Sequence, residues 1–221
     1  MLPPRLKTIF EFIPPCRFLA DIGCDHGFIP IEAVNKGIAK RAAACDISEP
    51  SLMKADKNIR FSGLSEVIEA RLGGGLAPLG CREADVIIIA GMGGHLIADI
   101  LYEGFEKIGG AKLILQPMTN IPDLRRRLTG GGFRITAEKL AKEDRRIYTV
   151  ITAEIGESAD YDCDIGSALI NAHDPLLTEW LSERLHAEEE ILSRIPPENG
   201  DYIKHKTLAD KYREVIKGYE C

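Results

Sequence analysis

A short segment with acidic residues and two glycines, Asp21-Ile22-Gly23-Cys24-Asp25-His26-Gly27, most constrains how this chain can fold. It follows the apolar run 18–20, which predicts a strand, and precedes residues 28–34, which predict a helix with proline in its first turn. Glycine tolerates the positive φ of a tight turn, and the first N–H groups of a helix point toward whatever occupies that turn. The segment therefore predicts a ligand-binding loop in an α/β fold.

Asp46 is a further candidate for ligand binding, because it lies about 20 residues past this loop. It ends the apolar run 42–45, where a dinucleotide fold has a carboxylate that accepts hydrogen bonds from ribose hydroxyls. Asp46 and Ser48 also precede a helical stretch, residues 52–61, so the alternative role is a helix N-cap. The spacing favours the ribose contact, and one carboxylate can serve in both roles.

Strand and helix signals continue to alternate along the chain. Strands are predicted at residues 67–72, 85–90 and 112–116, and the second is continuously apolar, as in a parallel strand covered on both faces. Helices are predicted at residues 96–106 and 121–128. This alternation predicts a doubly wound parallel sheet.

The pattern changes after residue 132. Residues 134–138 and 145–152 predict two strands whose short charged connection leaves no room for a helix. Only antiparallel strands can be joined so briefly, so a hairpin is expected at the edge of the sheet. The predicted sheet therefore departs from the six-stranded parallel arrangement of dinucleotide-binding folds.

Two amphipathic helices are predicted beyond residue 156. Apolar residues recur at helical spacing in residues 176–195, and a second stripe runs through residues 208–216. The segment Pro196-Pro197-Glu198-Asn199-Gly200 breaks the helix between them. Helices joined by so short a turn are expected to pair antiparallel.

The formal charge of −6 argues against indiscriminate nucleic-acid binding, which relies on a broad basic surface. Local basic tracks occur at residues 125–127, 145–146 and 204–206, and each has the alternative of a solvated helix or turn face. The sequence has no apolar run of membrane-spanning length and no apolar leader at its start. We therefore expect a cytoplasmic protein that does not associate with a membrane.

The six cysteines are scattered, with no C-x-x-C pair and no histidine at zinc-ligand spacing. They are Cys16, Cys24, Cys45, Cys81, Cys163 and Cys221. Several lie in apolar runs, so we interpret them as small reduced core residues and expect no metal site. Cys24 differs because it lies in the loop, where we expect its backbone rather than its sulfur to contact a ligand.

Three stretches together resemble the bacterial TrmK family. They are the loop at residues 21–27, Ala90-Gly91-Met92-Gly93-Gly94-His95-Leu96-Ile97, and Leu113-Ile114-Leu115-Gln116-Pro117. Members of this family are S-adenosylmethionine-dependent methyltransferases that act on N1 of an adenine at position twenty-two of tRNA. With the closing helical pair, the resemblance covers essentially the whole chain.

The resemblance implies an α/β fold in two parts. Residues 1–157 would form a Rossmann-like, S-adenosylmethionine-binding sheet of seven strands, parallel with one antiparallel edge strand. Residues 158–221 would form a coiled-coil-like antiparallel helical hairpin that contacts tRNA.

The resemblance also implies where the cofactor binds. The first loop would hold its methionine part, the acid that ends the second strand its ribose, and the turn after the fourth strand would face the methyl group. The residues expected to bind it are Asp21, Gly23, Cys24, Asp25, His26, Gly27, Asp46, Ile47, Gly74, Gly75, Leu76, Ala90 and Gly91. Where the family usually has R-L-G-D-G-L, this chain has R-L-G-G-G-L, so Gly74 supplies no carboxylate for the adenine. Adenine recognition would then rest on backbone groups and apolar contact.

Adenine N1 has an in-plane lone pair and needs no general base, so catalysis can come mainly from in-line positioning. Acceptors near the exocyclic amine would stabilise the charge that moves from sulfur to the ring. The candidates are the carbonyls of Ala90 and Gly91, the amide oxygen of Gln116 and the carboxylate of Asp25. The alternatives are a strand-end cap for Gln116, and a helix N-cap with a satisfied polar contact for Asp25 and His26.

In folded RNA the target base must be extruded into a pocket, so the protein needs contacts remote from the base. We expect these contacts from the turns after the fourth and fifth strands and from the basic arm of the helical pair. The residues are Met92, Gly93, Gly94, Pro117, Asn120, Lys204, Lys206, Lys211 and Arg213. The alternatives are packing for Met92 and dimerisation for the helical pair. We expect a monomer with tRNA as its partner.

Three other functions are compatible with parts of this pattern. A methyltransferase could act on a protein or a small molecule instead, and a non-catalytic RNA-binding adaptor would use the helical pair alone. A nicotinamide oxidoreductase is disfavoured, because Asp25 stands where a dinucleotide fingerprint needs glycine.

Overall fold

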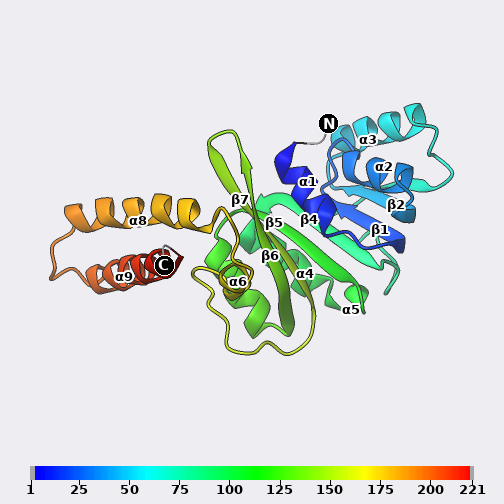
Figure 1. Cartoon of the computed structure of the whole chain (residues 1–221). Helices are drawn as coiled ribbons and strands as arrows, with labels where there is room; N and C mark the ends of the chain where they lie inside the picture. The colour runs from blue at the N-terminus through cyan, green and yellow to red at the C-terminus, as the bar shows by residue number, and fades with distance from the viewer. Residues whose placement is uncertain (1–2, 220–221) are drawn as a thin grey trace.

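The computed structural model describes residues 3–219, in which one seven-stranded sheet is present (Figure 1). The strands are β1 (Cys16–Ile22), β2 (Ala39–Asp46), β3 (Ile68–Leu72), β4 (Val86–Gly93), β5 (Lys112–Thr119), β6 (Phe133–Glu143) and β7 (Arg146–Ile155). Their order is β3-β2-β1-β4-β5-β7-β6, and β1 to β5 run parallel. The predicted doubly wound sheet is confirmed. Its order reverses between β1 and β4, which opens a crevice at their carboxyl ends.

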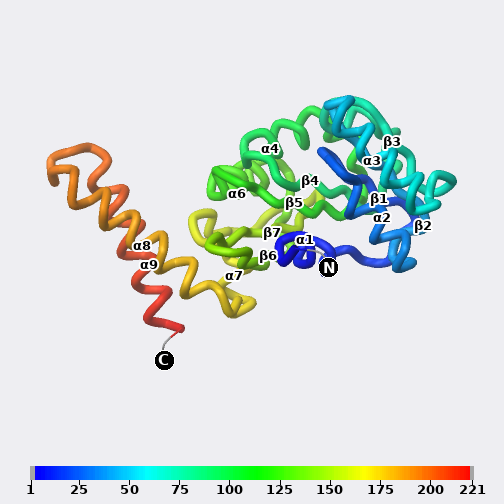
Figure 2. Tube along the Cα trace, turned by 90° about the horizontal axis from the view of Figure 1, so that it is seen from above, coloured from blue at the N-terminus to red at the C-terminus, as the bar shows by residue number. Residues whose placement is uncertain are grey.

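Helices cover both faces of this sheet, and Figure 2 shows α1 and α4 on opposite sides of it. They are α1 (Pro4–Glu11), α2 (Phe28–Asn35), α3 (Glu49–Phe61), α4 (Gly94–Glu103), α5 (Phe105–Ile108), α6 (Ile121–Gly130), α7 (Ser167–Asn171), α8 (Leu177–Arg194) and α9 (Tyr202–Tyr219). The first three pack on one face and the next three on the other. In β4, Ile87 and Ile89 face one core while Val86 and Ile88 face the other.

Two helical features differ from the prediction. Helix α1 was not predicted, although it starts at Pro4 and buries Ile9 and Phe10 on one face. The predicted helix 96–106 is divided into α4 and α5 at Gly104, where an added Cβ would lie 2.7 Å from the Leu76 side chain.

The hairpin predicted at the edge of the sheet is confirmed as β6 and β7. Strand β7 pairs antiparallel with β5, and β6 is the outermost strand. The antiparallel strand therefore lies inside the edge pair. Because β6 runs in the direction of β5, the turn of the hairpin lies at the same edge of the sheet as the carboxyl ends of β4 and β5.

Helices α8 and α9 pair antiparallel and extend away from the sheet (Figures 1 and 2), as predicted. Trp180, Leu181 and Tyr212 form a third core together with Leu140 of β6. The preceding segment, residues 156–166, is anchored by the buried ion pair of Arg125 and Glu138 (2.8 Å), because Arg125 also donates to carbonyls in this segment. The base of the helical pair is therefore packed on the β6–β7 hairpin.

Candidate active site

The loop between β1 and α2 is shaped by two glycines. Gly23 and Gly27 have φ angles of 74° and 67°, which residues with side chains rarely adopt. The N–H groups of Gly23 and Cys24 both donate to the carbonyl of Cys45, at 2.8 and 3.0 Å. The loop is thus tied to the end of β2. Cys24 is buried, and burial raises the pKa of its thiol, so the thiol stays uncharged at neutral pH.

Two carboxylates lie under this loop. Asp21 is buried at the end of β1, where burial and the charge of Asp46 raise its pKa to about 7. Asp46 accepts hydrogen bonds from the backbone N–H groups of Asp25 (3.2 Å) and Ser48 (2.8 Å). The N-cap of α3 is Ser48 rather than Asp46. Asp46 therefore joins the first loop to the start of α3, which sequence spacing alone did not predict.

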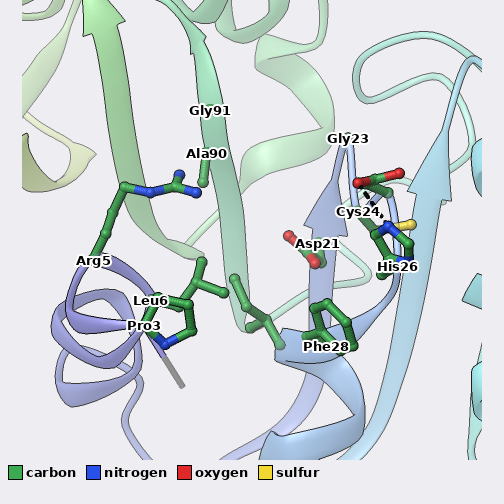
Figure 3. A pocket seen from close by; sticks show the side chains of 12 residues that line it. Pro3, Arg5, Leu6, Asp21, Gly23, Cys24, His26, Phe28, Ala90 and Gly91 are labelled. Atoms are coloured by element: carbon green, nitrogen blue, oxygen red, sulfur yellow. Dashed lines mark ion pairs between the residues drawn. The ribbon is translucent and has the colours of Figure 1, made fainter. Parts of the chain in front are cut away.

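A cavity of about 470 Å³ lies above these residues, between the first loop and α1 (Figure 3). One wall carries Asp21, His26 and Phe28, and the opposite wall carries Arg5 and Leu6 from α1. The lining also includes Pro3, Gly23, Cys24, Asp25, Ile29, Ala90 and Gly91. The N-terminal residues of this lining were not predicted as site residues. The sequence analysis predicted no element before residue 18, so it could not show that α1 covers the loop.

Asp25 and His26 contact each other on the exposed side of the loop. Asp25 Oδ2 lies 3.3 Å from His26 Nε2, and its Oδ1 lies 3.7 Å from Lys54 Nζ. The His26 ring stacks on Phe28 with a centroid distance of 5.2 Å. Neither residue is a helix N-cap, because Gly27 holds that position in α2. The polar-contact alternative is therefore correct for this pair, and the N-cap alternative is wrong.

Gln116 is completely buried, and its amide group is fully paired. Its Oε1 accepts hydrogen bonds from Arg5 Nη1 (2.7 Å) and from the Gly91 N–H (3.2 Å). Its Nε2 donates to the Pro117 carbonyl at 2.8 Å. The predicted alternative of a strand-end cap is met only in its contact with Pro117, because β5 continues through Thr119. The expectation that its amide oxygen is open to a substrate amine is not met, because Arg5 and Gly91 already occupy that oxygen.

The segment after Ala90 does not form an open turn, because β4 continues through Gly93 with an irregular register against β5. Met92 packs on the core, and its methyl group would lie 2.3 Å from a Cβ added to Gly23. Gly94 is buried, and an added Cβ would lie 2.5 Å from the Asn120 carbonyl. The substrate contact expected of Gly94 is therefore wrong in this structure, and the packing alternative for Met92 is correct. Gly91 remains exposed beside Arg5.

The other two residues expected to contact the substrate near the end of β5 differ in exposure. Pro117 is buried, whereas Asn120 is exposed and its Nδ2 lies 3.4 Å from His95 Nδ1. Asn120 has a φ of 55° and precedes α6. Asn120 thus faces solvent beside the crevice, while Pro117 does not.

The residues expected to contact the adenine of the cofactor, Ile47 and residues 74–76, also differ in exposure. A Cβ added to Gly74 would lie 3.3 Å from the Ile47 side chain, and Ile47 is 78% exposed. Leu76 is 2% exposed and packs in the core, so it has no surface for a ligand. Gly75 packs beside Ile100. The structure thus brings Ile47 and Gly74 together and excludes Leu76.

The basic residues of α9 also fall into two groups. Lys211 bridges Asp162 (2.9 Å) and Asp164 (3.0 Å), and Arg213 pairs with Glu189 and Asp210. These two side chains stabilise the helical pair, so the expectation that they face RNA is corrected. Lys204 and Lys206 are exposed near the start of α9 and form no ion pair with any residue in the range 3–219.

The other two basic tracks also differ in whether their side chains form ion pairs. Arg125, Arg126 and Arg127 are all engaged in ion pairs, so residues 125–127 form no open basic surface. Arg145 and Arg146 are exposed at the turn of the β6–β7 hairpin, and neither pairs with a carboxylate of the described chain.

The part of the chain that the structure describes has neither a membrane-spanning helix nor a cluster of metal ligands. No helix within residues 3–219 is long and apolar enough to cross a membrane. Within the same residues, no three His, Cys, Asp or Glu side chains are grouped as metal ligands would be. Cys221, one of the cysteines interpreted as reduced core residues, lies outside the described residues.

Comparison with known proteins identifies relatives over the whole chain. A model of a methyltransferase domain family matches residues 2–151. The chain is 35% identical to the tRNA (adenine(22)-N(1))-methyltransferase of Bacillus subtilis (strain 168), over 98% of this chain and 95% of that protein. The crystal structure of the B. subtilis M1A22 tRNA methyltransferase TrmK is similar, with 31% identity, a TM-score of 0.85, and coverage of 98% and 99%. A Streptococcus pneumoniae protein in complex with S-adenosyl-L-methionine has 33% identity, a TM-score of 0.89, and coverage of 98% and 100%.

Proposed function

The chain belongs to the TrmK family of tRNA methyltransferases, and we propose that it transfers a methyl group from S-adenosylmethionine to N1 of the adenine at position 22 of tRNA. The observation that carries this proposal is the cavity at the switch point of the sheet, with acidic groups on one wall and the exposed backbone of Gly91 on the other. Ligands of doubly wound sheets bind at this point.

The lining of the cavity fits the cofactor. Its volume, about 470 Å³, lies within the usual range for small-molecule sites. The amino-acid part of S-adenosylmethionine carries an ammonium and a carboxylate, and the two walls offer Asp21 and Arg5 as complementary charges. The carboxylate of Asp46 would accept the ribose hydroxyls, and Ile47 with Gly74 would cover the adenine.

The bound cofactor supplies an electrophilic methyl group on a positively charged sulfur. The chain's own part is mainly to position the acceptor, because adenine N1 attacks without prior deprotonation. As positive charge develops on the adenine, the carbonyls of Ala90 and Gly91, two residues that line the cavity, are the proposed hydrogen-bond acceptors for its exocyclic amine. Gln116 acts on this site through Arg5 and Gly91, so we assign it as a positioning residue. Asp25 remains a proposed acceptor from the opposite wall.

The two parts of the chain would divide the work. Residues 1–157 hold the cofactor and the target base, and residues 158–221 contact the body of the tRNA. Lys204 and Lys206 are the proposed phosphate contacts of the helical pair. We propose that the enzyme acts as a cytoplasmic monomer.

The test uses labelled S-adenosylmethionine and an unmodified tRNA transcript, followed by mass spectrometry of the nucleosides. The expected product is N1-methyladenine, and a transcript with guanine at position 22 should accept no label. Label on another atom, or equal labelling of both transcripts, would overturn the proposed substrate. Cofactor binding without transfer to any RNA would favour a methyltransferase of a protein or small molecule, tRNA binding without cofactor binding would favour the adaptor, and NAD binding would favour the oxidoreductase.

A further inference from the structure

A second hollow lies next to the active site, between the end of β5, the β6–β7 hairpin and α8. Its volume is about 280 Å³. Pro117 and Tyr148 are among its lining residues, and Arg145, Arg146, Arg184 and Glu183 contribute its charged groups. We call this hollow the arginine groove. Nothing in the proposed cofactor site uses it.

Arg184 is a partly buried cation without a counter-ion. Its guanidinium carbon lies 3.6 Å from the centre of the Trp180 ring, and it pairs with no carboxylate among residues 3–219. Burial lowers its pKa to about 10, so it stays charged at neutral pH. A charge held in this way is stabilised when an anion binds, because the anion replaces the solvation that burial removed.

The hairpin turn adds two further cations. Arg145 and Arg146 are exposed and unpaired within the described chain, and both line the groove. Glu183 is the one carboxylate in the groove lining. Glu143 and Asp144 precede the arginines on the hairpin but do not line the groove, and Glu143 accepts the backbone N–H of Arg5. The groove therefore carries three positive charges against one negative charge.

The groove is separated from the cofactor cavity by a thin wall of side chains. Arg5 lines the cavity, and its guanidinium carbon lies 5.6 Å from the centre of the Tyr148 ring, which lines the groove. Gln116 holds Arg5, and the next residue, Pro117, belongs to the groove. A nucleotide chain whose base reaches Gly91 must therefore place its neighbouring backbone close to the groove.

We infer that the arginine groove binds the backbone phosphates that flank the extruded adenine of the RNA substrate. This inference rests on the proposed function. The planar guanidinium groups of arginine suit bidentate contacts to phosphate oxygens. Since the groove lies between the hairpin and α8, bound phosphates would also couple the helical pair to the methyl-transfer site.

The first experiment compares one neutralised groove variant with one control variant of the same charge change. Arg145→Gln/Arg146→Gln removes the exposed pair, and Lys57→Gln/Arg60→Gln on α3 makes the same charge change at the other end of the sheet. Affinity for an unmodified tRNA transcript is measured over a range of salt concentrations. We expect the groove variant to lose about tenfold in affinity per arginine and about one unit of salt slope per phosphate contact. Affinity for S-adenosylmethionine should not change in either protein.

Arg184 needs a separate pair of variants, because its removal also exposes Trp180. Arg184→Lys retains the charge and Arg184→Gln does not. Thermal unfolding reports the packing loss that both share. Weaker tRNA binding by the Gln variant alone supports the groove, whereas equal binding by both variants counts against a charge contact.

The decisive measurement neutralises the RNA instead of the protein. A tRNA with methylphosphonates on both sides of the target adenine should bind the unaltered enzyme more weakly than the unmodified tRNA does. With this neutralised tRNA, Arg145→Gln/Arg146→Gln should bind almost as well as the unaltered enzyme. Fully additive losses would overturn the inference, as would a groove variant that behaves like its control. If the unaltered enzyme methylates the transcript in these cases, the proposed function stands and only the groove fails. If the unaltered enzyme neither binds nor methylates tRNA, both are overturned.

Discussion

Arg5 Nη1 donates to Gln116 Oε1 at 2.7 Å, which joins the first helix to the end of the fifth strand. The same oxygen accepts the N–H of Gly91, so one amide group sets the positions of the Arg5 guanidinium and the Gly91 backbone, both of which line the cavity. Because Gln116 is completely buried, water cannot replace it in this arrangement.

Gln116→Ala should reduce both stability and turnover. The change leaves the Gly91 N–H and the Pro117 carbonyl without a partner, which costs about 1–3 kcal/mol of unfolding free energy. Turnover should decrease by more than cofactor affinity, because Gln116 holds the Gly91 segment that is proposed to contact the target base. Urea unfolding, calorimetry and single-turnover rates measure the three quantities. Equal losses in turnover and cofactor affinity would contradict the positioning role.

Arg5→Ala should weaken the binding of S-adenosylmethionine. We expect a loss of about 1.5–3 kcal/mol if the guanidinium pairs with the cofactor carboxylate, and partial recovery in Arg5→Lys. Arg17→Ala is the control, since Arg17 is an exposed arginine at the opposite end of β1 that pairs with Asp85. Calorimetry decides the matter, and unchanged affinity in Arg5→Ala would remove this residue from the cofactor site.

Asp46→Ala should weaken cofactor binding more than Asp46→Asn does. The alanine variant loses the ribose acceptor and also the acceptor for the Asp25 and Ser48 N–H groups, whereas asparagine retains one oxygen. Ser48→Ala serves as the control, because it removes only the N-cap of α3. If Ser48→Ala weakens binding as much as Asp46→Ala, the effect comes from α3 and not from a ribose contact.

Asp21 should make the stability of the ligand-free protein decrease with rising pH. Its pKa is raised from 3.8 to about 7 in the folded chain, so the folded state holds a proton that the unfolded state has released. Its contribution is complete below about pH 4 and is lost as pH rises through 7, with a slope of at most about 1.4 kcal/mol per unit. The unfolding free energy of Asp21→Asn should therefore rise relative to that of the unaltered protein between pH 4 and 8. Urea unfolding at several pH values measures the unfolding free energy of each protein. The exposed control Asp160→Asn should show the same pH dependence as the unaltered protein, and the same result for Asp21→Asn would contradict this prediction.

The two groups of lysines in α9 should respond differently to substitution. Lys204→Gln/Lys206→Gln should weaken tRNA binding without changing thermal stability, because both side chains are exposed. Lys211→Gln should lower the unfolding temperature, since Asp162 and Asp164 would lose their shared partner. Filter binding and thermal unfolding separate the two effects. A Lys204→Gln/Lys206→Gln variant with unchanged tRNA affinity would remove these lysines from the RNA surface.

Much of the fold was predictable from the sequence. The loop at residues 21–27, the strand that ends at Asp46 and the breaker at residues 196–200 all depend on the conformations of neighbouring residues, so local patterns reveal them. The parallel order up to β5 and the edge hairpin followed from the alternation of elements and the lengths of their connections. The motif resemblance then indicated which loop ends hold the cofactor.

Only the tertiary structure decided which side chains the site can use. Gln116, Lys211 and Leu76 looked available in the sequence, yet each is occupied by a partner from another element or buried in the core. Arg5 was not predicted as a site residue, yet it lies across the cavity from Asp21. The physical reason is that backbone conformation and hydrophobic periodicity are set within a few residues, whereas burial and pairing depend on contacts between segments distant in the sequence. Lys211 and Asp164 are 47 residues apart, and Arg5 and Gln116 are 111 residues apart.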